Sequence, residues 1–317
     1  MTQTLLRILE TILPVFGVAG VGYLFSRWVL DRKPQPGGQR IDAASVKRAL
    51  HTLTFHYAGP ALVFTALRES TVGFEALGAP ALVALVMYVL LTLVAVGLAA
   101  ALRWGTDERK GAVLALASKN CGNYGLPIIL FAFGESALVI GTVFMITHIL
   151  VHMTLGLSIA SWSGEHPVRK RILQVLRFPY IYAIGLALIL RVLGVELPMA
   201  ISRTVALVGE LWIPLMLLLL GVELSAIRIG HVFKAATLLT CVKLLVPPVV
   251  AFGLTTLLGI DGVTQSVLVL QSSMPTAVNG LLVARQFDAR PDLVASTLLL
   301  STLGSILTIA LLLAFFG

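Results

Sequence analysis

The stretch Asn120-Cys121-Gly122-Asn123-Tyr124-Gly125-Leu126-Pro127 decides the fold. It places two asparagines, two glycines and one proline within eight residues of an otherwise apolar segment, 111–133. Proline removes a backbone donor and glycine weakens a helix, so a continuous helix is a poor expectation here. Non-helical backbone inside a membrane is tolerated only where it is buried in protein or lines a cavity. The stretch therefore predicts a broken helix, and the remaining sequence indicates where that helix lies.

The composition of the chain indicates an all-α membrane protein. Of its 317 residues, 58% are hydrophobic and 12% are charged, and the mean hydropathy is +0.96. A soluble domain is about 45–50% apolar and about 25% charged. Because a helix needs about 20 apolar residues to cross a bilayer, we expect ten spans, at roughly 5–28, 44–67, 79–103, 111–133, 137–161, 176–194, 200–224, 232–258, 263–286 and 292–316. The strict alternation typical of an outer-membrane barrel is absent from the sequence.

Lysine and arginine are distributed unevenly between the two expected faces. Of the 23, 17 lie in or beside the loops that follow odd-numbered spans, and four lie on the other face. Cytoplasmic loops are enriched in these residues, so both termini are expected outside the cell, in a bacterial inner membrane. The net charge of +8 then follows from topology, and no nucleic-acid partner is expected. The first span lacks a basic start and a small-residue cleavage site, and we interpret it as an uncleaved helix.

The second half of the chain repeats features of the first. Three pairs of positions are separated by 154 residues: Pro60 and Pro214, His56 and Glu210, and Phe133-Gly134 and Phe287-Asp288. The fourth and ninth spans are both interrupted by Gly, Pro and Asn. Interrupted helices in corresponding positions of two halves point to the binding site of a secondary transporter. We therefore predict two inverted five-helix repeats, 1–161 and 162–317.

These motifs resemble the auxin efflux carrier family, which includes plant PIN carriers and bacterial malonate- and malate-type permeases. The stretch from Asn120 to Pro127 is similar to the signature of that family's fourth span. The seventh, ninth and tenth spans agree through Pro214-Leu215-Met216-Leu217, Gly221-Val222-Glu223-Leu224, Met274-Pro275-Thr276-Ala277-Val278, Val283-Ala284-Arg285-Gln286-Phe287 and Pro291-Asp292-Leu293-Val294-Ala295-Ser296. The loop between the fifth and sixth spans is short, as in bacterial members, which argues against auxin as the substrate.

The resemblance implies a fold like that of bile-acid symporters and sodium/proton antiporters. A scaffold domain would pair with a transport domain in which the fourth and ninth spans cross as broken helices. It also implies an organic-anion substrate and a homodimer in the lipid bilayer.

Half-helices that meet at the membrane midplane point their positive N-termini into the cavity, which favours a carboxylate. The substrate-binding residues predicted at this crossing are Asn120, Asn123, Tyr124, Gly125, Pro127, Pro275, Thr276 and Asn279. The asparagines could donate hydrogen bonds to the anion or cap the interrupted backbone. Gly125 and Gly280 would let a substrate approach the main chain.

Ionisable residues inside the spans are further candidates, for charge balance or proton coupling. Lys119 could balance the anion or extend to the interface. Lys243 lies deeper and could pair with Glu210 or Glu223. Histidine titrates near neutral pH, so His56, opposite Glu210 in the repeat, could relay protons. Three more histidines within the expected spans could relay protons or serve in packing: His51, His148 and His152.

The absences narrow the function. Every aspartate lies in or beside a loop, which argues against sodium/proton exchange and for anion transport. Cys121 and Cys241 lie in apolar segments, and the sequence contains no metal cluster, Walker loop or nucleophile–base set. We expect a secondary transporter of a small organic anion, without cofactor or metal, working by elevator-type alternating access. The alternatives are a sodium-coupled, bile-acid-like symporter, a non-transporting membrane sensor and, least favoured, an intramembrane enzyme.

Overall fold

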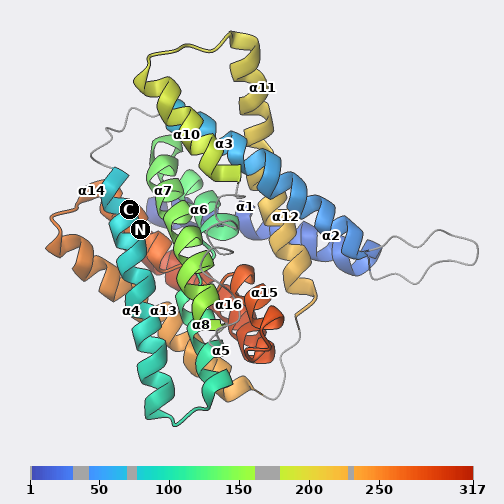
Figure 1. Ribbon diagram of the computed structural model, residues 1–317, viewed down its shortest axis with the longest axis vertical. Coiled ribbons are helices and arrows are strands. Elements are labelled where there is room, and N and C mark those ends of the chain that lie inside the picture. Colours follow the sequence, from blue (N-terminus) through green and yellow to red (C-terminus); the bar gives the residue numbers. More distant parts are fainter. Residues whose placement is uncertain (1, 31–42, 70–76, 161–178, 228–231, 317) are drawn as a thin grey trace, which may run out of the picture. The chain divides into compact units, whose positions relative to one another are not determined.

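The computed structural model describes residues 2–30, 43–69, 77–160, 179–227 and 232–316 (Figure 1). Across these ranges the regular structure is helical and contains no strand. Six helical segments are long and apolar enough to cross a membrane: Ile8–Leu30, Gly78–Ala101, Glu135–Ala160, Met199–Ser225, Phe233–Leu257 and Pro291–Phe316. Shorter helices fill the other expected ranges. Much of the positive charge expected in the cytoplasm falls on 31–42 and 161–178, which lie outside the described residues.

The chain divides into two compact units. The larger unit comprises Met1–Glu10, Val72–Val175 and Ile227–Gly317, and the smaller unit comprises Thr11–Thr71 and Leu176–Ala226. Each unit therefore takes helices from both halves of the sequence.

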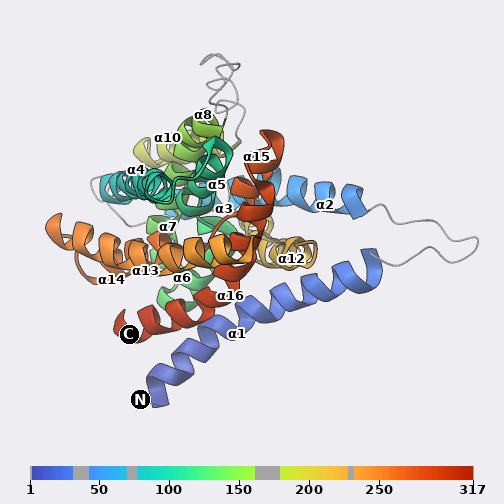
Figure 2. The same cartoon turned by 90° about the horizontal axis from the view of Figure 1, so that it is seen from below.

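The larger unit contains both of the interrupted spans. Its helices from the first half are α4 (Gly78–Ala101), α5 (Thr106–Ala117), the π-helix η4 (Cys121–Gly125), α6 (Leu126–Phe133), α7 (Glu135–Val151), the π-helix η5 (His152–Gly156) and α8 (Leu157–Ala160). Those from the second half are α13 (Phe233–Leu257), α14 (Gly262–Ser272), α15 (Val278–Gln286) and α16 (Pro291–Phe316). Figure 2 shows α13 and α16 side by side.

Helices of the larger unit correspond in pairs along the sequence. The first residues of α4 and α13 are 155 positions apart, and their last residues are 156 apart. For α5 and α14, the first residues are 156 positions apart and the last residues 155. The contacts correspond as well, since α4 packs on α5 and α7 while α13 packs on α14 and α16. At the turn after each broken helix, Gly134 has φ +79° and Asp288 has φ +48°. Both halves thus use a left-handed residue at the same point.

The centre of the larger unit is formed by the first half-helix of each interrupted span. Every residue of α5 from Gly111 to Ala117 is buried, and so is every residue of α14 from Ser266 to Ser272. A helix that is covered on all sides belongs to a protein interior. The two breaks that follow these helices are therefore enclosed by the other helices of the unit.

The smaller unit contains the part of α1 (Thr2–Phe25) that follows Glu10. Its other helices from the first half of the chain are the π-helix η1 (Ser26–Leu30), α2 (Ala43–Thr52), the π-helix η2 (Leu53–Ala58) and α3 (Gly59–Glu69). The second half adds α10 (Pro179–Val192), α11 (Met199–Glu210) and α12 (Trp212–Ser225). α3 packs against α10 and α11 (Figure 1). Glycine allows a close approach of α1 and α12, because a Cβ at Gly221 would overlap the carbonyl of Ala19.

Both repeat-related prolines of the smaller unit follow a distortion in the helix. Pro60 stands in the first turn of α3, which follows η2, and Pro214 stands in the first turn of α12, after the turn at Leu211. Proline cannot donate to the carbonyl four residues earlier. Those carbonyls belong to His56 and Glu210, so the missing hydrogen bond falls at the same place in each half.

Candidate functional site

The two breaks of the larger unit meet. Helical backbone stops at Ala117 and at Ser272, and the next residues, 118–120 and 273–277, are not helical. The amide of Asn120 donates to the carbonyl oxygen of Pro275 across a distance of 2.8 Å. The hydroxyl Oγ1 of Thr276 donates to the carbonyl of Ala115, also at 2.8 Å. Each break therefore supplies a hydrogen-bond partner to the other half of the chain.

The local sequence explains where the helices stop. A residue before proline is disfavoured in helical conformation. Met274 precedes Pro275, so α14 cannot continue through it, and the helix ends at Ser272. Pro127 stands in the first turn of α6, which follows η4, and cannot donate to a carbonyl of η4. The distortion in the first half is consequently displaced toward the N-terminus, into residues 118–120 and η4. The sequence predicted the break within 120–127, and the non-helical part begins two residues earlier.

Lys243 satisfies the end of α5. Its side chain lies in the middle of α13 and is fully buried. The amine Nζ donates to the carbonyls of Leu116 at 2.7 Å and Ser118 at 2.6 Å. The last carbonyls of a helix have no intrahelical donors, so Lys243 supplies hydrogen-bond donors that the break leaves missing. Glu210 and Glu223, the partners considered from the sequence, belong to the smaller unit, where Glu223 contacts His51 at 2.9 Å.

Lys119 and Asn120 carry buried donors without partners. Lys119 is 3% exposed and Asn120 is 4% exposed. Neither Nζ of Lys119 nor Nδ2 of Asn120 has a hydrogen-bond partner among the described residues. Burial of an unpaired amine is costly, so these two donors are suited to an acceptor that the chain itself does not supply.

The other predicted substrate-binding residues are placed around the same breaks. Asn123 lies in η4 and is 8% exposed, while Asn279 is half-buried in the first turn of α15. Tyr124 is fully buried, and its hydroxyl accepts a hydrogen bond from Ser305 at 3.0 Å. The space beside Gly125 is filled by Gln271 and Met274. All eight substrate-site residues predicted from the sequence thus lie in or beside the two breaks of the larger unit, and their role in binding stays a prediction.

Two histidines of α7 and η5 support the crossing. His148 accepts the backbone N–H of Lys119 on Nε2 at 3.0 Å, which requires a neutral ring with its proton on Nδ1. The rings of His148 and His152 stack with their centroids 6.4 Å apart, and Nδ1 of His152 lies 3.1 Å from the Tyr88 hydroxyl. These contacts position the break through hydrogen bonds and packing.

His56 and Glu210 belong to the smaller unit. Both side chains are exposed, and no hydrogen bond or ion pair joins them in the described part of the chain. Their assignment to proton coupling therefore stays a prediction from the repeat.

Sequence reasoning missed a polar stripe on α16. Ser296, Thr297, Ser301, Thr302 and Ser305 are fully buried, and Ser301 accepts the backbone N–H of Thr276 at 3.1 Å. The signal was present in the sequence as hydroxyl residues recurring at helical spacing inside an apolar span.

The buried ionisable side chains beside the breaks include two lysines and no carboxylate among the described residues. Among the described residues of the larger unit, the buried charged side chains are Lys119 and Lys243, and no aspartate or glutamate is buried. No group of three His, Cys, Asp or Glu residues that could hold a metal occurs in the described ranges. The breaks therefore offer hydrogen-bond donors and basic groups, which can bind an anion.

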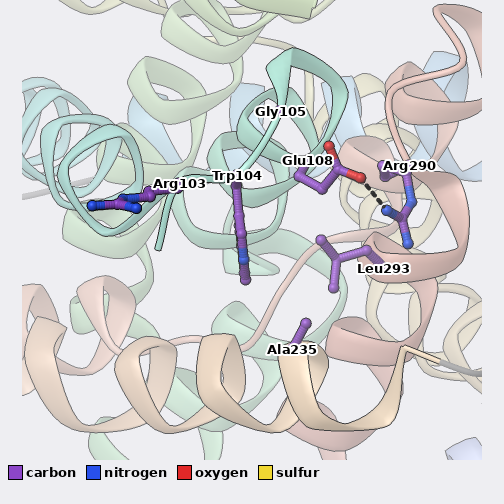
Figure 3. Close-up of a pocket in the computed structure, with 7 residues that line it drawn as sticks. All are labelled: Arg103, Trp104, Gly105, Glu108, Ala235, Arg290 and Leu293. Atoms are coloured by element: carbon purple, nitrogen blue, oxygen red, sulfur yellow. Dashed lines mark hydrogen bonds and ion pairs between the residues drawn. The ribbon is translucent and has the colours of Figure 1, made fainter. Parts of the chain in front are cut away.

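A cavity of about 380 Å³ lies elsewhere in the larger unit, at the turn between α4 and α5. Figure 3 shows Trp104 between Arg103 and the Glu108–Arg290 pair, with the Arg103 side chain directed away from that pair. Arg290 binds Asp292 at 3.0 Å and Glu108 at 2.5 Å, and these hydrogen bonds raise the pKa of its guanidinium above its usual value. Since two carboxylates already compensate Arg290, this cavity is a poorer anion site than the crossing.

Comparisons with known proteins agree with the resemblance seen in the motifs. The family described as membrane transport protein matches residues 7–313. An uncharacterized transporter of Methanothermobacter thermautotrophicus is 29% identical over 309 residues, covering 95% of this chain and 96% of the relative. A second uncharacterized transporter, from Methanocaldococcus jannaschii, is 28% identical over 211 residues, covering 65% and 68%. A candidate malonate transporter of Rhizobium meliloti is 25% identical over 309 residues, covering 94% and 92%.

The apolar helices and this family together identify an integral membrane protein that transports a small molecule. The match extends over nearly the whole chain, so the resemblance predicted from the motifs is confirmed. The chain belongs to the membrane transport protein family, that of the auxin efflux carriers.

Proposed function

We propose that the protein is a secondary transporter that carries a small organic carboxylate anion, bound at the crossing of the two broken helices. One observation carries the proposal: the buried donors of Lys119 and Asn120 have no partner in the described structure, in a unit that buries two lysines and no carboxylate. A carboxylate would accept both donors and offset the buried positive charge. Charge-assisted hydrogen bonds of this kind are about twice as strong as neutral ones.

The half-helices add to this preference. The second half-helices, η4 with α6 and then α15, begin at the breaks and direct N-terminal N–H groups toward them. Asn123 and Asn279 stand in these first turns and can donate amide hydrogens. A helix N-terminus is favourable for an anion. The asparagine amides are neutral, so they can donate hydrogen bonds to an anion and still release it.

The proposed architecture is ten spans arranged as two inverted five-helix repeats, 1–161 and 162–317. Support comes from the sequence separations of corresponding helices, from their matching contacts and from the left-handed residues at Gly134 and Asp288. The larger unit would be the transport domain and the smaller unit the scaffold, with elevator-type movement between them. A homodimer in a bacterial inner membrane, with both termini outside, completes this proposal.

The substrate class is proposed to be a small carboxylate or dicarboxylate. The two buried lysines of the larger unit support it, and the candidate malonate transporter of Rhizobium meliloti is consistent with it. Transport without sodium, as a uniport or linked to protons, is expected because the described residues of the larger unit bury no carboxylate to bind a metal cation.

A binding screen tests the proposed function. Purified protein in detergent is heated with a panel of mono- and dicarboxylic acids, and one or more should raise the unfolding temperature in a concentration-dependent way. A hydrogen bond to a charged group contributes about 1.5–3 kcal/mol, so Asn120→Ala, Asn123→Ala and Asn279→Ala should each weaken affinity about ten- to hundredfold. Lys119→Met should weaken it by at least as much.

The matched controls are an amide and a lysine away from the breaks. Gln265 of α14 donates to Thr255 and Thr256, so Gln265→Ala removes an amide without touching the crossing. Lys234 is an exposed lysine of α13, so Lys234→Met removes a charge from the surface. If the three asparagine variants and Lys119→Met bind the acid as the parent does, the crossing is not the binding site.

A further inference from the structure

Lys243 is a buried amine that the binding of an anion does not by itself explain. Its Nζ is committed to two main-chain carbonyls, those of Leu116 and Ser118. The side chain is fully enclosed and comes from α13, far from α5 in the sequence. This lysine therefore joins a helix of the second half to the break of the first.

The two carbonyls are a natural site for a cation. They belong to the last turn of α5 and to the residue that follows it, where carbonyl groups lack helical donors and carry partial negative charge. In carriers with interrupted helices, unwound carbonyls and half-helix C-termini commonly coordinate the coupling sodium ion or proton. Here the amine of a side chain occupies that position at 2.6–2.7 Å.

A metal ion would compete poorly at this position. The described residues of the larger unit bury no carboxylate, and the two buried lysines, Lys119 and Lys243, would repel a second cation. Because Lys243 is tethered, its amine is present in every transport cycle without being taken from solution.

We propose that Lys243 is a built-in cation that replaces a diffusible coupling ion at the crossing. It holds the end of α5 in place and supplies the positive charge that an ion would otherwise bring. Anion transport consequently needs no sodium, and removing the amine should create a vacant cation site with two carbonyl ligands. The inference rests on the proposed function for its transport readout, but not for its readout by protein stability.

The experiment compares the parent chain with Lys243→Ala, Lys243→Met and the surface control Lys234→Met. Each is purified in detergent and reconstituted in liposomes, in the chloride salts of choline, sodium, lithium or ethylammonium at equal ionic strength. Unfolding temperature is measured without substrate, and uptake is measured with labelled malonate. Ethylammonium is small enough to replace the end of the missing side chain in the alanine variant.

The parent and Lys234→Met should behave alike in all four salts. Lys243→Ala should lose uptake by about tenfold or more in choline, corresponding to about 1.4 kcal/mol, and should recover uptake and several degrees of unfolding temperature in ethylammonium or sodium. Lys243→Met fills the space without charge, so it should lose uptake and respond to no salt. A purely structural lysine would give a loss that no cation reverses.

Three results would overturn the inference: sodium-dependent uptake by the parent chain, normal uptake by Lys243→Met, or a folded Lys243→Ala variant whose stability and uptake respond to none of the cations. If neither variant folds in any salt, the parent decides, since sodium dependence overturns the inference and sodium independence upholds it. Absence of malonate uptake by the parent in every salt would instead count against the proposed substrate, while the cation response of Lys243→Ala would still test the site.

Discussion

The packing of α15 against α5 can be tested at Gly280. An alanine Cβ at this position would lie 2.8 Å from the carbonyl oxygen of Leu114 and closer still to the hydroxyl of Ser118. Real Cβ atoms essentially never come this near to a backbone atom, so one half-helix must move away from the other. Because Ser118 itself donates to that same carbonyl at 2.5 Å, its hydroxyl has little freedom to give way.

The magnitude follows from two opposing effects. Overpacking a well-filled interior costs about 1–3 kcal/mol, and replacing glycine by alanine within a helix returns up to about 1 kcal/mol. We expect Gly280→Ala to lower the free energy of unfolding by about 1–2 kcal/mol. Gly253→Ala in α13 is the matched control, since no atom lies within 4 Å of its Cβ, and it should gain about 0.5–1 kcal/mol.

Equilibrium unfolding in mixed micelles of dodecyl maltoside and sodium dodecyl sulfate measures both variants against the parent. The two should differ from each other by about 2 kcal/mol, and Gly280→Ala should also lose uptake because it displaces the break. Equal stability of the two alanine variants would show that the half-helices are not packed as described.

Three further outcomes are expected. Thr276→Val removes the hydrogen bond to Ala115 and should cost about 1–2 kcal/mol in the same unfolding assay, with a loss of uptake; stability equal to the parent would contradict the contact. Arg290→Ala breaks partly exposed ion pairs worth about 0–1 kcal/mol, and malonate uptake should stay within about fivefold of the parent, since about 1.4 kcal/mol corresponds to tenfold; a larger loss would move the anion site to the cavity beside α4. In a Cys241→Ser chain, a cysteine at Asp261 should react with an impermeant thiol reagent in intact cells and one at Asp107 should not; the reverse pattern would invert the topology.

The sequence predicted the breaks because their causes are local. Pro127 and Pro275 lack a donor, and the glycines and asparagines around them favour non-helical backbone. The pairing of Gly134 with Asp288 was also visible, since a fixed separation of 154 residues needs no knowledge of packing. The exact start of the first break was not, because it depends on how the first turn of α6 accommodates its proline.

The partners of the buried amines could not be predicted from local pattern. Lys243 meets the carbonyl of Leu116, 127 residues away along the chain, and His148 meets the amide of Lys119 across two helices. Main-chain carbonyls are acceptors at every residue, so nothing in the sequence marks which of them a lysine will reach. The same holds for Glu223, whose partner His51 became evident only from the packing of α2 against α12.

Solute counterflow tests the central claim most directly. Proteoliposomes are preloaded with unlabelled malonate, diluted into sodium-free buffer and given a trace of labelled malonate outside. A carrier whose crossing binds carboxylates should accumulate the label transiently. Lys234→Met should do so equally, and Lys119→Met and Asn120→Ala should fail at the same trace concentration. Counterflow that is equally strong in all four proteins would contradict the assignment of the crossing as the anion site, and absence of counterflow for every small carboxylate would contradict the proposed transport.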